Sequence, residues 1–118
     1  MRHNVKPGEI YWTKDVATIN RFGERILKNR PTLIVTNSCG LKNSGICTVI
    51  PLSSKIEKVH KTNCNVLVGN FLPKPSVTIS EQLTTISQTQ LLGEPIEKLD
   101  EVQFALVKDA VKRQLGLQ

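Results

Sequence analysis

Arg30 is the residue of this sequence best suited to hold an anion. It precedes Pro31 and the β-branched or aliphatic run Thr32–Thr36, which is typical of a short strand covered on both faces. Pro31 has no N–H for a strand ladder, so we expect it at the start of that strand, with Arg30 extended before it. A guanidinium held stiffly where loop becomes strand matches two phosphate oxygens at once. The alternative is a surface arginine paired with a neighbouring carboxylate.

Two further side chains can complete a phosphate site. Ser53 follows the predicted strand Ile46–Ile50, and if that strand neighbours Thr32–Asn37, Ser53 and Arg30 converge at one end of the sheet. RNA carries its own nucleophile, the 2′-hydroxyl, so an arginine and a hydroxyl suit its cleavage without metal. Glu24 is a candidate base or a partner that orients the arginine. The alternatives are a Ser53 hydroxyl that caps its own backbone and a solvated Glu24.

The bulk composition limits the class of protein. At 118 residues, with 39% hydrophobic and 22% charged residues, the chain is predicted to form one globular domain over residues 1–118. Its apolar runs are too short to span a membrane, and its N-terminus lacks the apolar core of a signal peptide. We therefore expect a cytoplasmic protein. A net charge of +6 favours an anionic partner, either nucleic acid or an acidic protein segment.

The remaining motifs exclude several kinds of site. Cys39, Cys47 and Cys64 are odd in number and lack zinc-site spacing, so we interpret them as buried small residues or free thiols. The sequence contains no GxGxxG, P-loop or HExxH motif. We predict neither a metal nor a cofactor.

Short strands followed by one helix must position these residues. Strands are expected at Glu9–Thr13, Thr32–Asn37, Ile46–Ile50, Cys64–Val68 and Ser76–Glu81. Residues 14–30 read as a long polar connection with a hinge at Gly23. Phe22 in that connection either stacks on a base or packs back onto the body. Residues 38–45 read as a turn region.

The C-terminal part is expected to be helical. Ser87–Leu91 is typical of a single helical turn, which Leu92–Pro95 breaks. Asp100 is a plausible N-cap, and Gly116 a C-terminal stop. The predicted apolar face of this helix comprises Phe104, Val107, Val111 and Leu115, widened by Val102, Leu106 and Ala110. The fold class is therefore mainly β with a C-terminal helix, in a small barrel-like sheet.

Four segments, taken in order, resemble the motifs of the MazF/PemK/Kid family, the toxin halves of bacterial toxin–antitoxin pairs. They are Pro7–Tyr11, Gly23–Glu24 followed by Arg30–Pro31, Gly45–Ser54, and Glu81–Ile86. The C-terminal Leu115-Gly116-Leu117 also fits. The resemblance implies an SH3-like barrel of the CcdB/PemK type that forms a homodimer. It also implies a metal-independent endoribonuclease that cuts single-stranded mRNA at a short sequence, and a cognate antitoxin whose acidic or amphipathic tail occupies the RNA groove.

Carried over by position, the resemblance makes Arg30 the catalytic arginine, and Ser53 stands where the family usually has threonine. Glu24 falls in the region of the family's loop glutamate. Candidate RNA-binding residues are Arg25, Lys28, Asn37, Lys55, Gln82 and Thr84. Thr84 departs from the family, which commonly has Arg or Lys there. This departure leaves two alternatives open: a toxin of the same fold that inhibits a protein such as DNA gyrase, and an RNA-binding module without catalysis.

Overall fold

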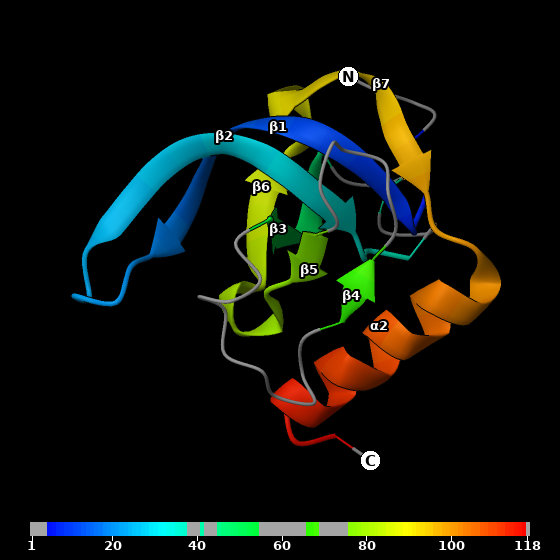
Figure 1. The fold of residues 1–118 in the computed structure, drawn as a ribbon. Coiled ribbons are helices and arrows are strands. Elements are labelled where there is room, and N and C mark those ends of the chain that lie inside the picture. The colour runs from blue at the N-terminus through cyan, green and yellow to red at the C-terminus, as the bar shows by residue number, and fades with distance from the viewer. Residues whose placement is uncertain (1–4, 38–40, 42–44, 55–65, 69–75, 118) are drawn as a thin grey trace.

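A computed structural model of the protein describes residues 5–37, 41, 45–54, 66–68 and 76–117 (Figure 1). The strands among them are β1 (Glu9–Ile19), β2 (Arg25–Ile34), β3 (Ile46–Ser53), β4 (Leu67–Val68), β5 (Ser76–Thr78), β6 (Thr84–Ser87) and β7 (Leu91–Lys98). Two short 3₁₀ turns, η2 (Ser80–Gln82) and η3 (Gln88–Gln90), precede β6 and β7, and the helix α2 (Glu101–Gln114) ends the chain. The mainly β class with a C-terminal helix is confirmed.

The strands form one curved sheet in the order β4-β5-β3-β2-β1-β7, with β6 paired to β3 beside β5. Every pairing is antiparallel. Among the described strands β4 and β7 end this path, so the sheet is barrel-like without closing. The helix α2 lies across one side of the sheet, and the β1–β2 hairpin extends away from the body as an arm (Figure 1). None of the described helices is long and apolar enough to cross a membrane.

Apolar side chains cover both sides of the central strands. Ile10, Leu33 and Ile50 are cross-strand neighbours, fully buried with Val107 of α2. A second buried cluster lies on the opposite face of these strands. It contains Tyr11, Ile34, Cys47, Val49, Ile86 and Leu91. The prediction that the strand after Pro31 is covered on both faces is thus confirmed. Cys47 is a buried free thiol as expected, whereas Cys39 and Cys64 lie outside the described residues.

Local signals set both ends of α2. The Asp100 carboxylate accepts a hydrogen bond from the Gln103 N–H at 2.7 Å, which confirms the predicted N-cap. Gly116 adopts a positive φ of 71° just past the helix, as a C-terminal stop requires. The prediction of a wide apolar face on this helix is wrong in part, because Val102, Leu106 and Leu115 are exposed. The helix packs on one sheet surface, so only a narrow stripe around Val107 and Ala110 is buried.

The predicted connection over residues 14–30 is wrong. Residues 14–19 continue β1, residues 25–30 begin β2, and the two strands pair as far as Ile19 and Arg25. The turn between them contains Gly23, whose φ of 80° suits glycine. The outer half of β2 is exposed on both faces. Backbone ladder bonds hold such an arm without the apolar alternation that normally marks a strand. Phe22 is 73% exposed at the tip, so it does not pack back onto the body.

Several predicted strand ends also differ. The strand Thr32–Asn37 ends at Ile34, and Ile46–Ile50 continues through Pro51 to Ser53. Pro51 is tolerated inside β3 because it lies between the residues that pair with β6 and those that pair with β5. The strand Ser76–Glu81 ends at Thr78, since η2 begins at Ser80.

The segment after η2 was predicted least well. The strand β6 was missed, and the predicted break at Leu92–Pro95 lies within β7. Gly93 and Pro95 are compatible with β7 because, among the strands that the structure describes, it is an edge strand paired only to β1. The helical turn at Ser87–Leu91 is confirmed as η3. Of the predicted strand Cys64–Val68, Leu67 and Val68 form β4, Val66 lies just before it, and the first two residues are outside the described part.

Candidate functional site

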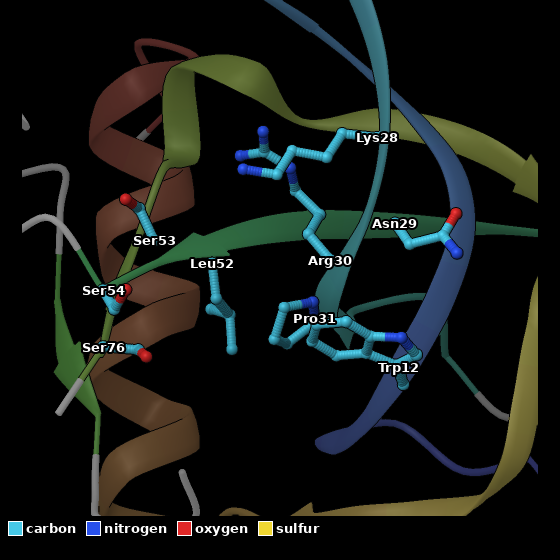
Figure 2. A pocket seen from close by; sticks show the side chains of 9 residues that line it. All are labelled: Trp12, Lys28, Asn29, Arg30, Pro31, Leu52, Ser53, Ser54 and Ser76. Atoms are coloured by element: carbon cyan, nitrogen blue, oxygen red, sulfur yellow. The ribbon is translucent and has the colours of Figure 1, made fainter. Parts of the chain in front are cut away.

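The candidate site is a pocket in the fork where β2 and β3 separate. β2 pairs with β3 only through Thr32–Ile34, and its outer half continues with β1 as the hairpin arm. β3 instead continues beside β5. A pocket of about 220 Å³ lies between them, lined by Trp12, Lys28, Asn29, Arg30, Pro31, Leu52, Ser53, Ser54 and Ser76 (Figure 2). The divergence of two paired strands therefore creates the cavity.

Arg30 is a half-buried cation in this pocket. Its Nε atom is buried without a hydrogen-bond partner in the described structure, and no carboxylate of the described residues pairs with it. Burial alone lowers the pKa of its guanidinium, although an arginine remains protonated in proteins. The alternative of a carboxylate-paired surface arginine is therefore wrong. An unpaired, partly desolvated guanidinium can bind an anion strongly.

A β-bulge positions this arginine. Thr13 pairs with Arg30 and Val16 with Lys28, so two residues of β1 oppose Asn29 alone. The Asn29 side-chain oxygen accepts a hydrogen bond from the backbone N–H of Asp15 at 3.0 Å across the bulge. Because bulges bend and twist a strand, this one bends the arm at the point where Lys28, Asn29 and Arg30 line the pocket.

The prediction that Arg30 lies where a loop becomes a strand is wrong. Arg30 lies inside β2, and Pro31 pairs with Trp12 in mid-strand. Pro31 is tolerated because it is the last residue before β2 gains β3 as a second neighbour. Two residues apart on β2, Lys28 and Arg30 share one face of the strand. The two cations therefore project on the same side of the arm.

Ser53 is the last residue of β3 and is half-buried in the same pocket. The prediction that neighbouring second and third strands bring Arg30 and Ser53 to one place agrees with this arrangement. Figure 2 shows the two side chains on different strands of the fork. A cation and a hydroxyl facing one cavity can bind the oxygens of a single phosphate.

Glu24 lies elsewhere, at the turn of the hairpin. Its carboxylate accepts a hydrogen bond from the Asn20 side-chain amide at 3.1 Å, and its backbone N–H donates to the Asn20 side-chain oxygen at 3.0 Å. Glu24 precedes Arg30 by six residues of nearly continuous strand, which places it roughly 20 Å away at a strand's rise per residue. The structure therefore does not bring it to the pocket.

Three of the predicted RNA-binding residues line a second hollow under the arm. Arg25, Gln82 and Thr84 contribute to a pocket of about 310 Å³ together with Ala17, Thr18, Ile19, Glu81 and Leu83. The Gln82 side chain is already engaged, since its amide binds both backbone groups of Ile19 at 2.9 and 2.8 Å. In this structure Gln82 therefore ties the arm to η2.

The remaining candidates lie apart. Asn37 is exposed beyond β2 and lines neither pocket, and Lys55 lies outside the described residues. Lys28, a predicted RNA-binding residue, lines the fork pocket together with Arg30. Sequence reasoning missed Trp12 and Ser76. No local pattern marks either residue, because Ile10, on the same face of β1 as Trp12, is as fully buried as Tyr11.

Comparisons with known proteins agree with the geometry. The fold is similar to an endoribonuclease from a mycobacterial species, with a TM-score of 0.75 at 16% identity over 99% of this chain and 95% of that one. It is also similar to Mycobacterium tuberculosis toxin MazF-mt6, with a TM-score of 0.74 at 24% identity over 93% and 98%. A Deinococcus radiodurans MazE-MazF structure gives a TM-score of 0.69 at 17% identity over 97% of both chains.

Sequence comparison identifies the family directly. Comparison with curated protein sequences finds no match. The family model of the PemK-like, MazF-like toxin of type II toxin–antitoxin systems, however, matches residues 6–115, nearly the whole chain. The expected resemblance is thereby confirmed. This chain belongs to the PemK-like, MazF-like toxin family of type II toxin–antitoxin systems.

Proposed function

We propose that this protein is a toxin that cleaves single-stranded RNA at a short sequence without a metal ion. The observation that carries the proposal is the shared pocket of Arg30 and Ser53, with Arg30 unpaired among the described residues. The endoribonucleases of similar fold support the same activity. The non-catalytic, gyrase-inhibiting alternative is less well supported, because it gives this arrangement no role.

The chemistry needs few protein groups. The 2′-oxygen of one ribose bonds to the adjacent phosphorus while the bond from phosphorus to the 5′-oxygen breaks. The 2′-hydroxyl proton leaves to a base and the 5′-oxygen gains a proton, giving a 2′,3′-cyclic phosphate and a 5′-hydroxyl. Arg30 stabilises the negative charge that grows on the non-bridging oxygens, and Ser53 donates a hydrogen bond to one of them. Lys28 attracts the neighbouring phosphate.

The partners follow from charge and family. A net charge of +6 favours binding both to RNA and to an acidic antitoxin tail. We infer that this tail binds over the fork pocket and competes there with RNA. A second mycobacterial endoribonuclease of similar fold is in complex with its cognate antitoxin, and the Deinococcus radiodurans structure contains MazE with MazF. We further infer a cytoplasmic homodimer in which residues 1–118 fold as one domain, which light scattering and a single unfolding transition would test.

The decisive experiment is cleavage in EDTA. A long single-stranded RNA is incubated with the purified protein, and the cut ends are mapped. We expect discrete cuts with 2′,3′-cyclic phosphate and 5′-hydroxyl ends. Arg30→Ala should lower the rate at least 100-fold, while the matched control Lys112→Ala, an exposed cation on α2, should leave it unchanged. Intact RNA with the parent protein, or equal cleavage by Arg30→Ala, would refute the proposal.

A further inference from the structure

Ser76 is a buried hydroxyl in the fork pocket without a hydrogen-bond partner. It is 1% exposed, and its Oγ atom is buried and unpaired in the described structure. Burying a hydroxyl without a partner costs roughly 1–3 kcal/mol, and alanine would fill nearly the same space. By contrast the hydroxyls of Thr13 and Thr32 contact each other at 2.7 Å, and that of Thr78 accepts from the Val66 N–H at 2.9 Å. The unpaired Ser76 hydroxyl therefore needs an explanation.

The position of Ser76 supplies one. Ser53 pairs with Val77 and Val68 pairs with Ser76, so Ser76 is one residue from the partner of Ser53 and its side chain projects to the opposite face of the sheet from Ser53. Both line the fork pocket, and Figure 2 shows the Ser76 hydroxyl oxygen turned toward the side where Leu52 and Pro31 lie. The Nε atom of Arg30, in the same pocket, is likewise buried without a partner in the described structure. Two unsatisfied donors, one of them cationic, thus belong to residues that line one cavity from opposite faces of the sheet.

A ligand that satisfies both donors must present at least two acceptor oxygens and a negative charge. A phosphodiester does so with its two non-bridging oxygens, and each hydrogen bond is stronger where water is excluded. We propose that Ser76 donates a hydrogen bond to a non-bridging oxygen of a scissile phosphate held in the fork pocket, from the opposite side of that pocket to Ser53. This inference rests on the proposed function, because it assigns Ser76 a contact in the same reaction.

The test compares the parent protein with Ser76→Ala in single-turnover RNA cleavage. We expect the rate constant to fall about 10-fold or more, as for the loss of one donor to a developing oxyanion. The matched control Thr85→Ala removes an exposed hydroxyl on β6, away from both pockets, and should stay within twofold. The melting temperature of ligand-free Ser76→Ala should equal or exceed that of the parent, because no protein hydrogen bond is lost.

A phosphorothioate substrate separates a contact from an indirect effect. Sulfur in place of the contacted oxygen accepts hydrogen bonds poorly, so one thio diastereomer should slow the parent more than it slows Ser76→Ala. Equal rates for the parent and Ser76→Ala, or the same thio effect in both, would overturn the inference.

Titration with inorganic phosphate makes the test independent of catalysis. Ser76→Ala should bind phosphate at least threefold more weakly than the parent. If the parent binds phosphate but leaves RNA intact, the proposed function fails while this comparison still decides whether Ser76 contacts the anion. Equal phosphate affinities would count against Ser76 in either case.

Discussion

The side-chain amide of Gln82 binds both backbone groups of Ile19, accepting from its N–H at 2.9 Å and donating to its carbonyl at 2.8 Å. This pair joins η2 to the free edge of the hairpin arm, which carries Lys28 and Arg30. A glutamate can replace only the accepting half of the pair. We predict that Gln82→Ala, which removes the acceptor of the Ile19 N–H, increases amide hydrogen exchange at Ile19 at least 10-fold, that Gln82→Glu, which keeps an acceptor, increases it less, and that Thr85→Ala does not increase it. Unchanged exchange would show that the amide does not restrain the arm, and would return Gln82 to the candidates for reading RNA.

Arg30 should lower stability while it serves function. A half-buried charge without a carboxylate partner among the described residues lowers the free energy of unfolding, and other contacts in the fold must offset this loss. Arg30→Met keeps the length and removes the charge, so the free energy of unfolding should stay equal or rise by roughly 1 kcal/mol, while RNA cleavage is lost. Denaturant unfolding measures the change, with Lys112→Met as the exposed control. A loss of more than about 1 kcal/mol in Arg30→Met would instead reveal a structural role for the guanidinium.

Trp12 should report directly on RNA binding. It is the single tryptophan of the chain, 41% exposed, and lines the pocket next to Arg30. A base beside the bound phosphate can stack on its ring, so single-stranded RNA should quench its fluorescence. Trp12→Ala should weaken binding about 10-fold and Trp12→Phe by less than about threefold. The control Val102→Ala changes an apolar residue on α2 that is 72% exposed, and should bind as the parent does. Equal affinity of Trp12→Ala would place the bound bases away from this ring.

Glu24 should contribute little to proton transfer. It lies at the hairpin turn, bound to Asn20, roughly 20 Å along the strand from Arg30. Glu24→Gln keeps the oxygen that accepts from the Asn20 amide, so the cleavage rate should change less than about threefold and the acidic limb of its pH profile should persist. A 10-fold loss together with a flattened acidic limb would instead identify Glu24 as a base that hairpin movement delivers to the pocket.

Cys47 should make stability depend on alkaline pH. Burial raises the pKa of its thiol from 9.0 to about 11 in the folded protein. The raised pKa means that this contribution to stability is complete below pH 9, where the thiol is protonated in both states. It is lost as pH rises from 9 through 11, because the unfolded thiol ionises first.

Cys47→Ala provides the reference for this prediction, because the other titrating groups are common to both proteins. The difference in free energy of unfolding between the parent and Cys47→Ala should shrink by up to about 1.4 kcal/mol per pH unit over that range. A constant difference across the range would mean that the thiol ionises equally easily in both states.

Short-range sequence signals predicted the features that depend on adjacent residues. Asp100 and Gly116 mark the ends of α2 because a cap and a left-handed turn involve residues only a few positions away. The apolar run after Pro31 predicted a strand buried on both faces for the same reason. Placing Arg30 and Ser53 together needed one further assumption, that the second and third strands are neighbours, and they are.

Only the tertiary structure decided what depends on distant pairing. The polar residues 14–30 form a hairpin because β1 and β2 satisfy each other's backbone groups, which no local apolar pattern reveals. The same pairing carries Glu24 to the tip of the arm, away from Arg30. The fork pocket exists because β2 follows β1 while β3 follows β5, and this divergence brings Trp12 and Ser76 into one pocket with Arg30. The sequence by itself therefore determined the helix, the buried strands and the chemistry of Arg30 and Ser53, while contacts between segments far apart in the chain determined the cavity in which that chemistry can occur.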